Sequence, residues 1–165
     1  MRILGIDPGL VHTGWGIVEC AGNKLRGIAS GTISANPKSQ TAERLHHIFE
    51  QLSSVIAEYK PATAAVEDSL VAQNSASALK LGMARGIALL APAQMSIPVC
   101  EYSAKLVKKS VVGTGSADKN QIFLMVQRLL PGLEIESEHA ADALAIAICH
   151  GHHAETQQKF HIKSA

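Results

Sequence analysis

One segment near the C-terminal end of the sequence limits the possible folds more than any other. Between Ala140 and Ile148 all residues but one are apolar, so a helix over residues 138–150 has no polar side to leave in water. Ser137 stands directly before it and suits the N-cap position. The one exception, Asp142, is costly to bury unless it is paired or binds a metal ion. The sequence therefore predicts a buried helix that carries a functional carboxylate.

The rest of the chain supplies elements that can cover such a helix. Strand patterns are expected at residues 2–6, 13–20, 24–34, 62–66 and 97–100, and helices at 45–59, 74–91, 103–110 and 117–130. The second and third strands flank Ala21-Gly22-Asn23, which is a hairpin signal. Three strands in a meander followed by alternating helices and strands are typical of an α/β fold. We therefore predict a mixed five-stranded sheet flanked by helices on both faces.

Composition narrows the class of protein. The 165 residues are 47% apolar and 18% charged, which is typical of one globular domain, expected at 1–152 with a mobile tail at 153–165. No uncharged apolar run is long enough for a membrane span. The three cysteines lack close-pair spacing and indicate free thiols in a cytoplasmic protein. A net charge of +1 argues weakly against binding of nucleic acid through overall charge alone, so such binding would need a local basic face or metal ions.

Two further carboxylates stand where apolar runs end. Asp7 ends the first strand before Pro8-Gly9, and Glu67 ends the fourth. Either residue alone could equally cap a turn. If the two strands are neighbours, both carboxylates reach one edge of the sheet, where open α/β sheets bind ligands.

The predicted buried helix adds a third group to this set. His139 and Glu138 precede Asp142 by three and four residues, so each shares its helix face. Both can also be solvated residues of the first turn. Carboxylates from distant segments suit magnesium, and two such ions can activate a water and neutralise a phosphodiester during hydrolysis. The sequence therefore favours a nuclease site.

A glycine-rich segment, Gly113 to Lys119, leads into the helix expected at 117–130. If Ser116 caps that helix, its free amides and Lys119 form an anion site. Lys105, Lys108 and Lys109 form a basic cluster nearby, and a solvated helix face is at least as good an explanation for them.

Several motifs in order resemble the RuvC family of bacterial Holliday-junction resolvases, which have a ribonuclease-H-like fold. They are Gly5-Ile6-Asp7-Pro8-Gly9, Ser77-Ala78-Leu79-Lys80-Leu81-Gly82 with Ala84-Arg85-Gly86, Val111-Val112-Gly113 with Gly115–Lys119, and Ala141–Ala147. The resemblance extends over roughly residues 1–152.

The resemblance implies a homodimer that binds a four-way DNA junction and nicks two opposed strands, using two Mg²⁺ per site, with Mn²⁺ also supporting activity. It implies 5′-phosphate and 3′-hydroxyl products and branch-migration partners of the RuvA/RuvB type. By position it assigns catalysis to Asp7, Glu67, His139, Asp142 and Lys119, the first four as metal ligands, and DNA contacts to Leu70, Asn74, Lys105, Lys108 and Lys119.

Two departures from the family pattern concern function. His139 stands where many relatives have aspartate, and imidazole suits manganese better than magnesium. We therefore expect stronger activity with manganese, and loss of activity as His139 protonates at low pH. The loop from Asp68 to Asn74 lacks the aromatic residue that the family often has there.

Other readings of the sequence remain open. A non-catalytic junction-binding module with a degraded site is the main alternative. An actin-like ATPase fits Asp7, Gly9 and Gly14 loosely but needs a second lobe. Gly82 and Gly86 permit close helix approach, either within one subunit or between two.

Overall fold

The computed structural model describes residues 1–22, 24–68 and 74–162, with side chains up to Ala154. It contains the predicted mixed sheet of five strands, in the order β3-β2-β1-β4-β5. The strands are β1 (Arg2–Asp7), β2 (His12–Ala21), β3 (Lys24–Ser34), β4 (Thr63–Glu67) and β5 (Val99–Tyr102). The helices are α1 (Thr41–Tyr59), α2 (Ser75–Gln94), α3 (Ala104–Val112), α4 (Lys119–Leu129) and α5 (Glu138–Ile162).

Strands β1 and β4 are neighbours, as the prediction for the site required. They run parallel, with Leu4 opposite Ala64 and Ile6 opposite Val66. Asp7 and Glu67 therefore leave the sheet at the same edge. β2 is antiparallel to β1, and the turn between them lies at this edge too.

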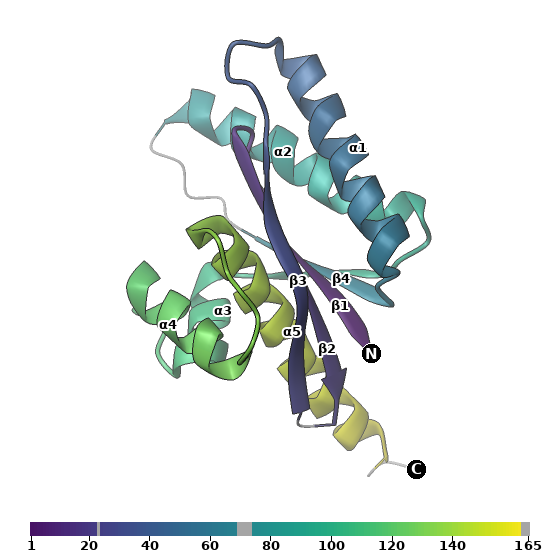
Figure 1. The fold of residues 1–165 in the computed structure, drawn as a ribbon, viewed down its shortest axis with the longest axis vertical. Coiled ribbons are helices and arrows are strands. Elements are labelled where there is room, and N and C mark those ends of the chain that lie inside the picture. Colours follow the sequence, from purple (N-terminus) through teal and green to yellow (C-terminus); the bar gives the residue numbers. More distant parts are fainter. Residues whose placement is uncertain (23, 69–73, 163–165) are drawn as a thin grey trace.

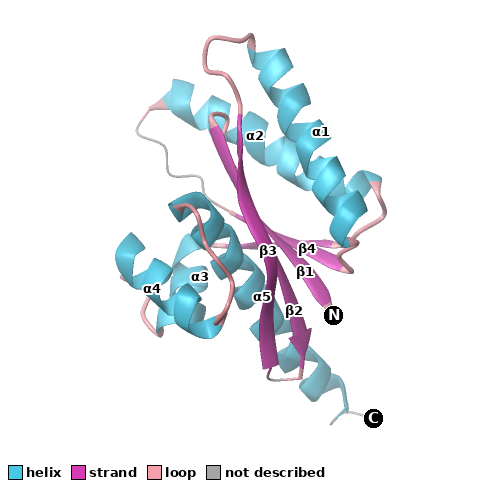
Figure 2. Cartoon of the chain, in the orientation of Figure 1, coloured by secondary structure: helices cyan, strands magenta, loops and turns pink. Residues whose placement is uncertain are grey.

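Helices cover both faces of the sheet (Figures 1 and 2). α1 and α2 pack on one face around Leu4, Ile6 and Ile48. α3, α4 and α5 pack on the other around Ile3, Val18 and Leu144. The prediction of an α/β fold with a covered mixed sheet is confirmed.

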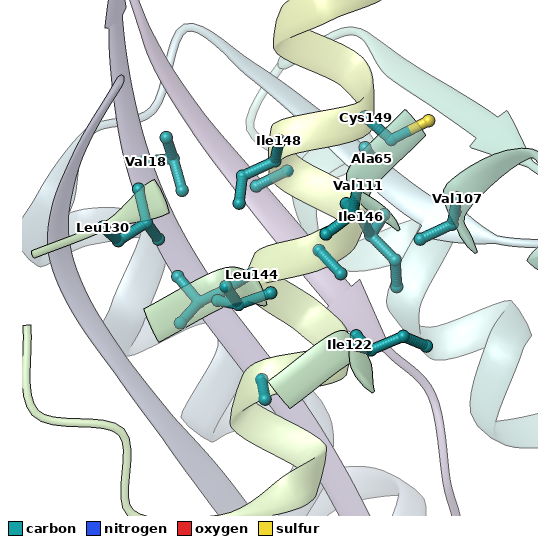
Figure 3. Packing of buried hydrophobic residues seen from close by; sticks show 14 of the residues in the cluster. Val18, Ala65, Val107, Val111, Ile122, Leu130, Leu144, Ile146, Ile148 and Cys149 are labelled. Atoms are coloured by element: carbon teal, nitrogen blue, oxygen red, sulfur yellow. The ribbon is translucent and has the colours of Figure 1, made fainter. Parts of the chain in front are cut away.

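α5 is buried from Ala140 to Gly151, with only Asp142 partly exposed, as its apolar composition predicts. Leu144, Ile146 and Ile148 are fully buried between the sheet and helices α3 and α4 (Figure 3). Ser137 caps the helix by accepting a hydrogen bond from the Ala140 amide at 3.0 Å. A methyl group on Gly5 would collide with the Ala143 carbonyl oxygen, so glycine allows α5 to approach β1 this closely.

Several predicted boundaries were wrong. α1 begins at Thr41, four residues before its predicted start. β5 begins at Val99 rather than Ile97, because Pro98 has no N–H to donate and pairing with β4 starts only at Val99 opposite Ala64. α5 continues to Ile162, well beyond the predicted end near residue 150. None of the helices in the described part is long and apolar enough to cross a membrane.

His150, near the predicted end of the last helix, is a buried polar residue. Its side chain is 6% exposed and links two strands to α5. Nδ1 lies 2.8 Å from the Tyr102 hydroxyl on β5, and Nε2 lies 3.1 Å from the Thr63 hydroxyl on β4. Burial lowers the pKa of His150, so the neutral imidazole is favoured.

Candidate active site

A cavity of about 370 Å³ opens at the edge of the sheet where β1 and β4 end. It is lined by all five residues predicted to be catalytic: Asp7, Glu67, Lys119, His139 and Asp142. They come from β1, β4, α4 and α5, so only the folded chain brings them together. Lys108 on α3 also lines the cavity.

His139 is held against the first carboxylate. Its Nδ1 lies 3.2 Å from Asp7 Oδ2. This hydrogen bond raises the pKa of His139, while partial burial opposes the rise. His139 also stacks on His12, with ring centroids 5.4 Å apart.

Asp142 is a partly buried carboxyl group near two other carboxylates. Burial, followed by the charges of Asp7 and Glu67, raises the pKa of Asp142 to about 6. The ammonium of Lys119 opposes this rise, with Nζ 3.8 Å from Asp142 Oδ2 and 3.7 Å from Glu138 Oε2. Lys119 therefore lies within ion-pair distance of both α5 carboxylates, of which Glu138 is the exposed one.

The side chains in this cavity suit a hard divalent cation. Three carboxylates and an imidazole converge, and a bound cation relieves the repulsion that raises the pKa of Asp142. Within the described ranges, no three acidic, histidine or cysteine side chains already enclose an ion-sized space. Water and substrate oxygens would complete the coordination, which is the arrangement that magnesium prefers.

The start of α4 differs from the prediction. Asp118, not Ser116, caps the helix. Its Oδ1 accepts a hydrogen bond from the Gln121 backbone amide at 2.9 Å, and the Asp118 backbone amide donates one to Gln121 Oε1. A carboxylate therefore occupies the helix start that was predicted to bind an anion through free amides. Lys119 lines the active-site cavity and lies within ion-pair distance of the carboxylates of α5.

The predicted DNA contacts are dispersed. Asn74 caps α2 by accepting from the Ser77 amide, and Lys105 is exposed with its stem against Gly115. Leu70 lies outside the described residues. The extra negative charge at Asp68 is paired with Arg85, at 3.0 Å from its guanidinium.

His12 is a cavity residue that the sequence analysis missed. It opens β2, stacks on His139, and places Nδ1 3.1 Å from the Ser34 hydroxyl. The signal that could have found it is the tight turn after Asp7, because an antiparallel return brings the next strand's first residues back to the same edge.

With this geometry established, comparisons with known proteins assign the family. A model of the family described as crossover junction endodeoxyribonuclease RuvC matches residues 3–150. The RuvC of Paramagnetospirillum magneticum is 54% identical, over 96% of this chain and 96% of its own. The RuvC of Acidiphilium cryptum is also 54% identical, over 96% and 95%.

Solved structures agree with the sequence comparisons. Thermus thermophilus RuvC in complex with Holliday junction substrate has a TM-score of 0.88 and 33% identity, over 95% of this chain and 96% of that chain. Ydc2, the yeast mitochondrial Holliday junction resolvase, has a TM-score of 0.65 at 14% identity and shares the fold. The chain belongs to the RuvC family, whose nucleases depend on divalent metal ions.

Proposed function

We propose that this chain is an endonuclease that resolves four-way DNA (Holliday) junctions by paired, symmetrical, metal-dependent hydrolysis of phosphodiester bonds. One observation carries the proposal: Asp7, Glu67 and Asp142, from three distant segments, line one cavity together with Lys119. Family membership supports the same activity. Recombination and repair of DNA in the cytoplasm is the setting that fits it.

Each side chain has a role in this proposal. Asp7, Glu67, His139 and Asp142 bind two Mg²⁺ ions, for which Mn²⁺ substitutes, and these ions would supply an activated water and charge neutralisation at the scissile phosphate. Lys119 and Lys108 provide positive charge on the cavity wall for the phosphate oxygens. The bond cut is the one that leaves a 5′-phosphate and a 3′-hydroxyl.

Cleavage of two opposed strands requires two active sites, so we include a homodimer in the proposal. The exposed face of α2 supports it: Leu79 is 62% exposed and Leu90 52% exposed, with Met83 between them. A methyl group added at Gly82 or Gly86 would meet no described atom within 4 Å. Among the described residues these two glycines therefore have no close packing partner, and a second α2 can approach there. Branch-migration proteins of the RuvA/RuvB type would be further partners.

Incubation of the protein with a labelled four-way junction and Mg²⁺ or Mn²⁺ tests the activity. We expect symmetrical nicks, and an Asp7→Asn variant should lose at least about a hundredfold in rate while still binding the junction. Manganese should support the higher rate because of His139. Binding without nicks by the unmodified chain would support the alternative, a non-catalytic junction-binding module.

Sedimentation analysis tests the dimer separately. Leu90→Lys should shift the protein towards monomer, because it buries a charge in the proposed interface. Leu124→Lys is the matched control, since Leu124 on α4 is 65% exposed and lies outside α2. If both variants sediment like the unmodified chain, α2 is not the interface.

A further inference from the structure

Arg44, on α1, is a buried cation that the active site does not use. The residue is only 8% exposed. One terminal nitrogen donates to the Leu10 carbonyl oxygen at 2.9 Å, and Nε is buried without a hydrogen-bond partner. Within the described part of the chain, no carboxylate lies within ion-pair distance of this guanidinium. A buried charge with one neutral acceptor is costly, and an anion would offset that cost.

Arg44 forms part of the wall of an open hollow of about 410 Å³. Leu10 and Val11 line it from the turn after β1, and Ser77 and Lys80 line it from the first turns of α2. The lining thus contains two cations and a hydroxyl but no carboxylate. α2 also has no acidic residue in its first turn, so the positive end of its dipole is not neutralised there.

The turn between β1 and β2 separates this hollow from the active site. Pro8 and Gly9 line the active-site cavity, and the next two residues line the hollow. The Thr13 hydroxyl donates to the Gly9 carbonyl oxygen at 2.7 Å and stiffens the turn. The hollow lies on the α1–α2 side of the sheet, and α1 and α2 both begin at this end (Figure 1). DNA that crosses this edge can therefore contact both cavities.

We propose that Arg44, Lys80 and Ser77 form a second phosphate site, which binds a backbone phosphate of the DNA other than the one that is cut. This inference rests on the proposed function, because it assumes a DNA substrate at this edge. Arg44 supplies a guanidinium that is already held in place by its bond to the Leu10 carbonyl oxygen, and the exposed Lys80 supplies a second charge. Such a contact positions the backbone and carries no sequence information.

Junction binding by full-length protein in an Asp7→Asn background, with Mg²⁺ present, tests the site without cleavage. Fluorescence anisotropy at several salt concentrations gives the affinity and its salt dependence. Lys80→Gln should weaken binding about three- to tenfold and reduce the slope of log K against log salt by about 0.9. Ser77→Asp should weaken binding at least as much, because it places a carboxylate where the phosphate binds.

Each variant has a matched control. Lys24→Gln removes an exposed charge at the far hairpin and should leave affinity and slope unchanged. Ser75→Asp adds a carboxylate to the same first turn of α2, at a residue that does not line the hollow. Both serine variants favour the helix through its dipole, so a loss confined to Ser77→Asp is not a folding defect. If the melting curve of Arg44→Gln shows a folded protein, its junction affinity is measured in the same way.

The outcomes separate this site from the proposed function. If the unmodified chain neither binds nor cleaves a junction, the proposed function fails, and the second site fails with it. If it binds and cleaves but Lys80→Gln and Ser77→Asp behave like their controls, the second site alone is overturned. If Lys80→Gln changes the sedimentation coefficient and leaves DNA affinity intact, the hollow binds the partner subunit and the inference is also wrong. In the cleavage-competent background, a raised KM with unchanged kcat supports it.

Discussion

Glycines on the sheet and glycines on α2 have opposite surroundings in this molecule. A methyl group on Gly5 or Gly14 would collide with backbone atoms of α5, at Ala143 and His139 respectively. At Gly82 and Gly86 the same methyl group would meet nothing within 4 Å among the described atoms. The first pair allows α5, which carries Asp142, to lie directly on β1 and β2. The second pair leaves space that no described residue of the subunit fills.

The two pairs of glycines therefore have different roles in the structure. On the α5 side, close backbone contact sets the distance between catalytic groups, so the tolerance is a fraction of an ångström. On the α2 side, the space is useful only if something outside the subunit enters it.

Gly14→Ala should have the largest effect. Its methyl group would push the His139 backbone away from β2, and overpacking of this kind costs about 1–3 kcal/mol and occasionally more. Urea unfolding should show the loss of stability, and junction cleavage should fall with it, because His139 moves relative to Asp7. An unchanged unfolding midpoint would mean that α5 is not closely packed here.

Asp142→Asn should stabilise the metal-free protein at pH 8. The pKa of Asp142 is raised to about 6 from an ordinary value of 3.8, so ionisation opposes folding. The penalty is fully present above pH 6, declines as the pH falls, and is gone below about 4. About 1–3 kcal/mol is expected, since one pKa unit corresponds to 1.36 kcal/mol.

When metal is added, we expect the unmodified chain to be more stable than Asp142→Asn. Saturating Mg²⁺ should stabilise the unmodified chain and have little effect on Asp142→Asn, which lacks the charge that the ion neutralises. Thermal melts with and without chelator measure both effects. Equal stabilisation of the two proteins by Mg²⁺ would exclude Asp142 as a ligand.

Gly82→Ala should improve the helix and weaken the dimer. Alanine within a helix is favoured over glycine by roughly 0.5–1 kcal/mol, and nothing described lies in the way of its methyl group. Sedimentation should nevertheless show weaker self-association, because two helices can no longer approach as closely. A loss of stability like that of Gly14→Ala would abolish the contrast between the two sets of glycines.

The smallest effect concerns the titration of His139 in metal-free protein. Its hydrogen bond to Asp7 raises the pKa of His139, so the protonated form persists to higher pH than in an ordinary histidine. The stabilisation is present below about pH 6.5 and is lost as pH rises through the folded-state pKa. NMR titration should show the raised value, and Asp7→Asn should lower it.

Much of the fold followed from local patterns. α5 was predictable because its apolar residues leave it no exposed side, and Asp7 and Glu67 because each ends a strand. The cap of α4 was not, since Ser116 and Asp118 are both good N-caps that differ by only tenths of a kcal/mol. The burial of His150 depends on Thr63 and Tyr102, far away in sequence.

Arg44 shows the same limit for function. On a helix wheel it is one charge among several, and only the turn at Leu10 and the start of α2 enclose it. The burial of both His150 and Arg44 depends on packing between distant segments, and the periodicity of the sequence contains no information about such packing.

The place of α5 in the chain also affects how the protein is made. Every strand is synthesised before Asp142 and His139, and α5 contacts all five strands. Until that helix is made, α3 and α4 lack the helix that they pack against on this face of the sheet, and the nascent chain exposes apolar surface that invites aggregation or chaperone binding. The incomplete chain also lacks two of its four proposed metal ligands.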